Sequence, residues 1–150
     1  MAMAGLAVLL SIAACQSGRS THREINGIRF RVPPGYKTRN SSFPGVFVFN
    51  QQEDNTSALI QVYFEHRASP EPGSDLTQEQ IKSFGIRQTG KRKATLAGHD
   101  GACIEYSVSS LAQAECSFGS ELHTSFIGTP SKIADFYAFM EAAQPMQRNN

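Results

Sequence analysis

The sequence has almost no net charge, no long apolar segment and none of the common catalytic motifs, and each of these features argues against a class of proteins. Its 14 lysines and arginines nearly balance its 13 aspartates and glutamates, whereas dedicated nucleic-acid binders usually carry a basic patch and a high pI. No apolar run reaches the ~18 residues that a membrane-spanning helix needs. The length of 150 residues fits one domain. A nucleic-acid binder, a transporter and a multidomain enzyme are therefore all disfavoured.

Catalytic residues in a recognisable arrangement are also missing. The motifs GxSxG, HExxH, GxxxxGK(S/T) and GxGxxG do not occur. Glycoside hydrolysis needs two carboxylates that face each other across one cleft, but the hairpin register expected below puts Glu105 and Glu115 on opposite faces. The sequence thus predicts that the protein is not an enzyme. The alternative is an unrecognised hydrolase that depends on Glu105, Glu115 or His123.

The N-terminus has the pattern of a secretory signal. Residues 1–15 read MAMAGLAVLLSIAAC, an apolar run that closes on small residues. The last four of these residues resemble a bacterial lipobox, which implies lipid attachment at Cys15, and Gln16 after the cysteine implies sorting to the outer membrane. We expect a signal peptide at 1–14, a lipidated tether at 15–24 and a periplasmic protein anchored in the inner leaflet of the outer membrane. A short buried helix is the alternative.

Apart from Cys15, the sequence contains two cysteines, Cys103 and Cys116. In an oxidising compartment such as the periplasm, two cysteines most simply form one disulfide. They flank a predicted hairpin whose turn lies at residues 109–110. If Val108 faces Leu111, then Cys103 lies directly opposite Cys116, and a cross-strand bridge can form.

The alternatives for these cysteines are a zinc site or a reduced, catalytic thiol. His99 and His123 complete a possible Cys₂His₂ set with Cys103 and Cys116. The spacing lacks the CxxC and HxxxH pairs of common zinc sites, and an oxidising compartment works against free thiolates. We therefore expect no metal and no cofactor.

The spacing of apolar residues predicts a series of strands that is interrupted by one helix and followed by a second helix. Alternating or continuous apolar runs indicate strands at 28–32, 46–49, 58–65, 87–96, 102–108, 111–118 and 122–127. A helix is expected at 76–84, between a capping Asp75 and Gly85, and another from Pro130 to about residue 144, with Thr129 as its N-cap. This order predicts one α+β domain at 25–145, an antiparallel meander with helices packed on it, and a frayed tail at 146–150.

Three stretches resemble the PsbP-like fold, which bacterial envelope lipoproteins also use. They are residues 27–36 (GIRFRVPPGY), residues 95–106 (TLAGHDGACIEY) and the closing strand and helix at 122–140. The resemblance implies the fold just described. It implies no active site, because the family has no common set of catalytic residues.

A basic cluster interrupts the even charge balance. Five basic residues and no acidic residue lie between Gln80 and His99, and Lys91, Arg92 and Lys93 are consecutive. The cluster can contact lipid phosphates or an acidic partner. The alternative is a solvated edge strand whose lysines prevent aggregation.

Protein binding is the activity that these features favour. The loop at 38–45 combines an arginine, small hydroxyls and a lone phenylalanine, although Phe43 can instead fold back over the sheet. The loop at 65–74 and the turn at Glu121 are further candidates, whose end of the sheet the sequence does not decide. The predicted partner-binding residues are Arg39, Ser41, Ser42, Phe43, Arg67 and Glu121.

In size, tether and lack of catalytic residues, the chain resembles periplasmic immunity lipoproteins. We therefore expect an inhibitor of a peptidoglycan-degrading toxin, such as a type VI secretion effector. The alternative function is that of a non-catalytic lipoprotein in envelope assembly or maintenance.

Overall fold

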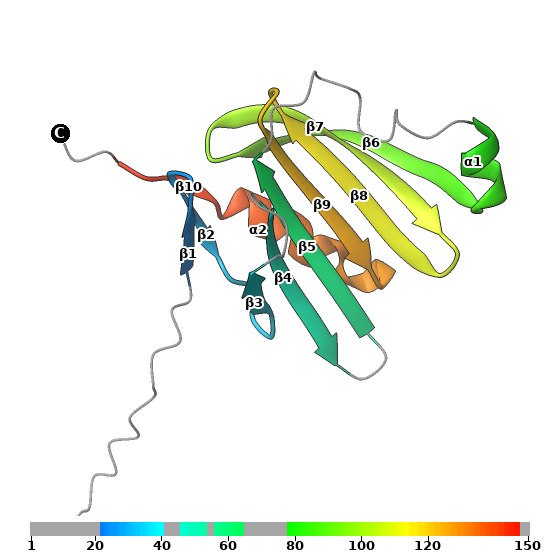
Figure 1. Cartoon of the computed structure of the whole chain (residues 1–150), viewed down its shortest axis with the longest axis horizontal. Helices are drawn as coiled ribbons and strands as arrows, with labels where there is room; N and C mark the ends of the chain where they lie inside the picture. The colour runs from blue at the N-terminus through cyan, green and yellow to red at the C-terminus, as the bar shows by residue number, and fades with distance from the viewer. Residues whose placement is uncertain (1–21, 41–45, 54–55, 65–77, 148–150) are drawn as a thin grey trace, which may run out of the picture.

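The computed structural model describes residues 22–40, 46–53, 56–64 and 78–147. In this part of the chain two antiparallel sheets and a C-terminal helix enclose one core (Figure 1). Cys15, Ser41, Ser42, Phe43 and Arg67 lie outside the described residues, so their predicted roles stay predictions.

The larger sheet has seven strands in the order β3-β4-β5-β9-β8-β7-β6, and every neighbouring pair is antiparallel. Two meanders, β3 to β5 and β6 to β9, meet where β5 pairs with β9. The predicted α+β fold with an antiparallel sheet is confirmed. The strands are β3 (Lys37–Asn40), β4 (Val46–Glu53), β5 (Thr56–Phe64), β6 (Ile86–Leu96), β7 (His99–Val108), β8 (Leu111–Phe118) and β9 (Leu122–Gly128).

The smaller sheet places β2 (Ile28–Arg31) between β1 (His22–Ile25) and β10 (Gln144–Pro145). The helical elements are α1 (Gln78–Ser83), the 3₁₀ turn η1 (Pro130–Lys132) and α2 (Ile133–Glu141). Gly85, with φ of 63°, follows α1 as the predicted stop. In Figure 1, α2 lies behind the larger sheet and α1 lies beside the start of β6.

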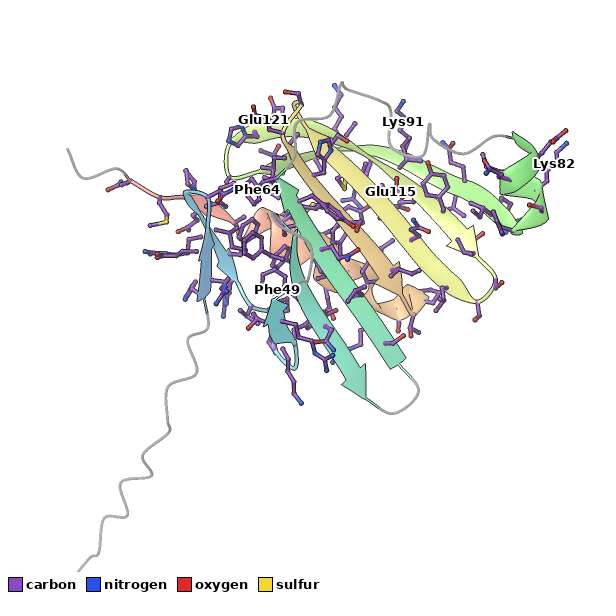
Figure 2. All side chains as sticks on the ribbon, viewed as in Figure 1. Phe49, Phe64, Lys82, Lys91, Glu115 and Glu121 are labelled. Atoms are coloured by element: carbon purple, nitrogen blue, oxygen red, sulfur yellow. A yellow bond between two sulfur atoms is a disulfide. The ribbon has the colours of Figure 1, made fainter. Side chains whose placement is uncertain are left out.

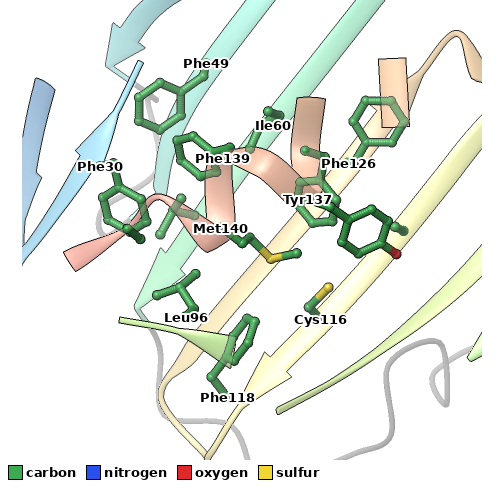
Figure 3. Close-up of a cluster of buried hydrophobic side chains, with 14 of the residues drawn as sticks. Phe30, Phe49, Ile60, Leu96, Cys116, Phe118, Phe126, Tyr137, Phe139 and Met140 are labelled. Atoms are coloured by element: carbon green, nitrogen blue, oxygen red, sulfur yellow. The ribbon is translucent and has the colours of Figure 1, made fainter. Parts of the chain in front are cut away.

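Helix α2 covers one face of the larger sheet and supplies much of the core (Figure 3). Helical spacing (i, i+3, i+4, i+7) predicts an apolar stripe of Ile133, Phe136, Tyr137 and Met140 that packs on the sheet. The stripe is confirmed, because Phe136, Tyr137 and Met140 are buried and Ile133 packs against the core cluster. Phe139, which the stripe omitted, joins the two sheets. Its ring lies 5.1 Å from that of Phe30 in β2 and 4.9 Å from that of Phe49 in β4, measured between centroids.

The register of the β7–β8 hairpin is the predicted one. Val108 pairs with Leu111 and Cys103 pairs with Cys116. The two cysteines form a disulfide across the pair, with 4.0 Å between their Cα atoms, and both are buried on the face that α2 covers. The predicted disulfide is therefore present in the structure.

Three short strands were not predicted. Residues 22–24, expected in the tether, belong to β1, and residues 37–40, expected in a loop, form β3. The C-terminal helix ends at Glu141 rather than near residue 144, and Gln144–Pro145 pairs with β2. These strands are short and largely polar, so backbone pairing with a neighbour stabilises them rather than an alternating apolar pattern.

The predicted strand bounds leave turns at about 51–57 and 97–101, and both turns are narrower in the structure. Polar residues of the expected turn at 51–57 instead extend the β4–β5 ladder, in which Gln51 pairs with Ala58. The expected turn at 97–101 shrinks to Ala97 and Gly98. Thr129 stands before the helical segment, but its hydroxyl accepts a 3.0 Å hydrogen bond from the Ser57 amide and so ties η1 to β5 instead of capping the helix.

Candidate partner-binding end of the sheet

Several hairpins of the larger sheet end on the same side. The register places the end of β3 at Asn40, the start of β4 at Val46 and the end of β5 at Phe64 beside the β8–β9 turn, which contains Glu121. The β6–β7 turn at Gly98 lies on this side too. We name it the loop end. The sequence alone did not decide whether Glu121 and the strands that flank residues 41–45 share one end, and the register shows that they do.

A groove of about 630 Å³ opens at the loop end. Side chains from the ends of β5, β8 and β9 and from β2 give it an apolar floor, and the turns that surround it give it a polar rim. An apolar concavity with a few polar groups is the usual composition of a binding site. The floor contains Ile28, Phe64, Phe118 and Leu122, and the rim contains Asn26, His99, Ser120 and Glu121.

The β1–β2 turn forms one wall of the groove. Asn26 and Gly27 have φ values of 46° and 79°, the left-handed conformation that a two-residue hairpin requires at both positions. The amide of Met146 donates a 2.8 Å hydrogen bond to the Gly27 carbonyl, so the segment after β10 holds this turn in place. This turn was not predicted, although Asn-Gly between Ile25 and Ile28 is a strong hairpin signal.

The predicted partner-binding residues that can be described lie on different parts of the loop end. Glu121 is exposed at the groove rim and lies near Phe64 in Figure 2. Arg39 is exposed on β3, one residue before the strand ends, on the face away from α2. Three strand spacings separate β3 from β9, or about 14 Å. The surface of a partner protein is wide enough to contact both positions.

Glu105 and Glu115, the carboxylates considered for hydrolysis, lie on opposite faces of the sheet, as predicted. Glu105 accepts a 2.5 Å hydrogen bond from the Tyr137 hydroxyl on the α2 side. Glu115 accepts one of 2.9 Å from the Gln113 amide on the other side. They do not flank a common cleft, so they do not form a glycosidase pair.

His123 does not complete a catalytic arrangement. Its Nδ1 lies 3.0 Å from the Ser117 hydroxyl, and its Nε2 is buried without a hydrogen-bond partner among the residues described. A catalytic histidine needs an accessible nucleophile and a group that orients the ring. His123 is buried, and within the described ranges no third side chain is hydrogen-bonded to its ring.

The Cys₂His₂ set considered for zinc is not assembled in the structure. Both sulfurs are used in the Cys103–Cys116 disulfide, and His99 is exposed at the groove rim. Within the described ranges no three His, Cys, Asp or Glu side chains gather in a way that could hold a metal ion.

Two tyrosines with raised pKa values hold α2 in place, and neither of them lines the groove. Burial raises the pKa of Tyr137, and its hydrogen bond to Glu105 adds to the effect. Burial likewise raises the pKa of Tyr36, with the nearby Asp135 carboxylate contributing. Tyr36, which lies directly before β3, donates a 3.2 Å hydrogen bond to Asp135 of α2, and Tyr137 of α2 donates one to Glu105 of β7, so each tyrosine links the helix to another part of the chain. The hydrogen bonds of these two tyrosines therefore stabilise the fold.

Comparison with known proteins finds likenesses in fold among solved structures. No protein-family model and no curated protein matches the sequence. The structure is similar to the cyanobacterial PsbP protein CyanoP from Synechocystis sp. PCC 6803, with 14% sequence identity and a TM-score of 0.45 over 79% of this chain and 86% of that one. In the described segments no helix has the length and apolar character to cross a membrane.

Proposed function

We propose that this protein is a periplasmic lipoprotein that binds and inhibits a protein partner through its loop end. The partner proposed is a peptidoglycan-degrading toxin of the kind that type VI secretion delivers, which makes the chain an immunity protein. The observation that carries the proposal is the convergence of the groove, Glu121 and the strands flanking residues 41–45 at one end of a rigid sheet. Loops that a rigid scaffold positions are common binding surfaces.

The size of this end favours a macromolecule. Glu121, in the turn before β9, and Arg39, on β3, are separated by three strand spacings, or about 14 Å, which fits within one side of a standard protein interface. An apolar floor ringed by polar side chains also resembles the core and rim of such an interface. A carboxylate at the rim, such as Glu121, can pair with a basic residue of a glycan-binding cleft.

A complex between the chain and its partner is the first test. The chain, tagged after its C-terminus, is isolated from the envelope and secreted fractions of its own organism, and bound proteins are identified by mass spectrometry. We expect a stoichiometric peptidoglycan hydrolase, and the purified complex should hydrolyse peptidoglycan more slowly than the hydrolase alone. An envelope-assembly complex without a hydrolase, or a bound hydrolase with full activity, would contradict the proposal.

Variants at the groove rim then locate the interface. Glu121→Lys reverses a charge at the rim, and Ser120→Tyr fills space beside it. The matched control is Glu79→Lys, which makes the same charge change on α1, at the opposite end of β6 from Gly98. We expect both rim variants to weaken the complex by at least about 10-fold, as a central interface residue does, and the control to leave affinity unchanged. Equal losses in all three variants would place the interface elsewhere.

A further inference from the structure

The exposed edge formed by α1 and β6 is basic, and the proposed inhibition does not use it. β6 is the last strand of the larger sheet, and α1 precedes it. Residues 78–96 contain one acidic residue, Glu79, whereas residues 99–147 contain six acidic residues and one basic residue. We name the five cations of 78–96 the basic edge: Lys82, Arg87, Lys91, Arg92 and Lys93. Figure 2 labels two of them, Lys82 and Lys91.

Most of these cations are not neutralised by neighbouring side chains. All five residues are exposed. Among the residues that the structure describes, Lys82, Arg87 and Lys93 form no ion pair. Arg92 stacks on the Tyr137 ring, with its guanidinium carbon 3.8 Å from the ring centroid, and a cation–π contact leaves its positive charge in place.

An exposed aromatic side chain lies at the start of this edge. Phe84, in the turn between α1 and β6, is 61% exposed, the largest value among the large hydrophobic side chains described. Lys82 precedes it and Arg87 follows it. Lysines on an edge strand can simply prevent aggregation, but that role does not account for a phenylalanine held in water beside them.

The cations point to both sides of the strand. The register puts Lys91 and Lys93 on the face away from α2, and Arg92 on the face that α2 covers. A single phosphate needs donors that converge on one point, and these side chains diverge. The headgroup layer of an anionic bilayer is extended, so the cations that contact it need not converge. The interfacial region of a bilayer also accepts an aromatic ring.

We propose that the basic edge and Phe84 form a contact surface for an anionic lipid bilayer. The strand lies edge-on to the membrane, its cations meet the lipid headgroups, and Phe84 enters the interfacial region. The contact is independent of the proposed inhibition and of acylation at Cys15, since only described residues of α1 and β6 take part. If the chain is also acylated, this edge fixes the orientation of the domain relative to the membrane.

The chain has no tryptophan, so a single substitution provides a local reporter. The test uses the full-length Phe84→Trp variant with phosphatidylcholine vesicles that contain, or lack, one third phosphatidylglycerol. We expect the fluorescence to shift to the blue and brominated lipids to quench it on the anionic vesicles alone. Salt at ~1 M, where the Debye length is about 3 Å, should reverse both effects.

The matched reporter is Ile127→Trp, a partly exposed apolar position on β9. β9 lies three strand spacings, or about 14 Å, from β6. This reporter should neither shift nor be quenched. Equal signals from the two reporters, or a Phe84→Trp signal that is the same on neutral and anionic vesicles, would overturn the proposal.

Charge removal provides a second measurement. The Arg87→Gln/Lys93→Gln variant should bind anionic vesicles roughly 10- to 30-fold more weakly, since each cation near the surface contributes about one factor of five. The control Arg31→Gln/Lys37→Gln removes two exposed cations from β2 and β3 and should bind like the parent chain. A loss as large in the control, or binding of the parent chain to an acidic protein but not to anionic vesicles, would refute a membrane contact at this edge.

Discussion

The hydroxyl of Tyr137 donates a 2.5 Å hydrogen bond to Oε1 of Glu105, and this bond fastens α2 to β7. Arg92, from the neighbouring β6, stacks over the same ring. Gly90 pairs with Glu105 beside a bulge, where a Cβ atom would lie 3.2 Å from the carboxylate. A helix residue and two strands thus meet around one half-buried carboxylate, so the contact holds the sheet edge against the helix.

The first prediction concerns this bond. Tyr137→Phe should lower the free energy of unfolding by about 1–3 kcal/mol, because Glu105 loses its donor while it stays half-buried. Glu105→Gln in the same background tests whether the two residues are coupled, and the coupling should be at least ~0.5 kcal/mol. Urea unfolding of the four proteins in this double-mutant cycle gives the value. Strictly additive losses would show that the bond contributes nothing.

The second prediction is that stability falls in alkali. The pKa values of Tyr36 and Tyr137 are raised in the folded state, whereas tyrosines of the unfolded chain ionise near pH ~10. Above that pH the folded state therefore binds more protons than the unfolded state, and stability decreases as the pH rises. Below it the contribution is fully present.

Unfolding free energies at several pH values above neutrality measure this effect. Each tyrosine should contribute at most about 1.4 kcal/mol per pH unit above pH ~10. The Tyr36→Phe/Tyr137→Phe variant should lose that part of the slope. An unchanged slope in the variant would show that the two phenols do not cause it.

The third prediction concerns the Cys103–Cys116 disulfide. The bridge closes a loop with a sequence separation of 13, for which the chain-entropy model gives a stabilisation of roughly 3 kcal/mol. Cys103→Ala/Cys116→Ala should lower the unfolding free energy by about this amount, and a reductant should destabilise the parent chain but not the variant. Alkylation without reductant should find neither thiol free. Two reactive thiols in the folded protein would contradict the assignment.

The fourth prediction concerns Phe139, which packs on Phe30 and Phe49 and so joins the two sheets through α2. Phe139→Ala should cost about 3–5 kcal/mol of stability, because a buried ring leaves a cavity. The same change at the exposed Phe84 should cost less than about 0.5 kcal/mol. Thermal unfolding of both variants compares the two positions directly, and equal effects would contradict the assigned core.

The fifth prediction tests the lipid anchor, which depends on residues outside those described. Cys15→Ser should release the protein from the membrane fraction, and globomycin should leave the precursor unprocessed. Normal processing in the presence of globomycin would remove the lipoprotein hypothesis. Because the basic edge does not include Cys15, residual binding of the variant to anionic vesicles is expected and is compatible with loss of the anchor.

Much of the fold could be predicted from local patterns. The β7–β8 register followed from the turn after Val108, because an antiparallel hairpin pairs residues symmetrically about its turn. That register also predicted the disulfide and the separation of Glu105 from Glu115. The α2 stripe followed from helical spacing. Each of these inferences depends on residues close in sequence.

The candidate site was not predictable in the same way. Phe64, Phe118 and Leu122 come together at the groove with the Asn26 turn only because β5 pairs with β9 and β10 holds β2. These pairings join residues far apart in sequence, and many such pairings satisfy the same alternation of apolar residues. Glu121 was proposed for a binding role, but its place on a groove rim required the assembled sheet.

The sequence by itself therefore determined the α+β class, the cysteine pairing, the apolar face of α2 and the run of cations between Gln80 and His99. These properties depend on spacing and charge, which the chain carries before it folds. Only the tertiary structure decided that the cations lie on an edge strand beside an exposed Phe84, and that the Glu121 turn shares one end with the β3–β4 strand ends. Strand order and the side that each hairpin occupies are set by long-range pairing and by burial against α2, and no short window of the sequence contains that information.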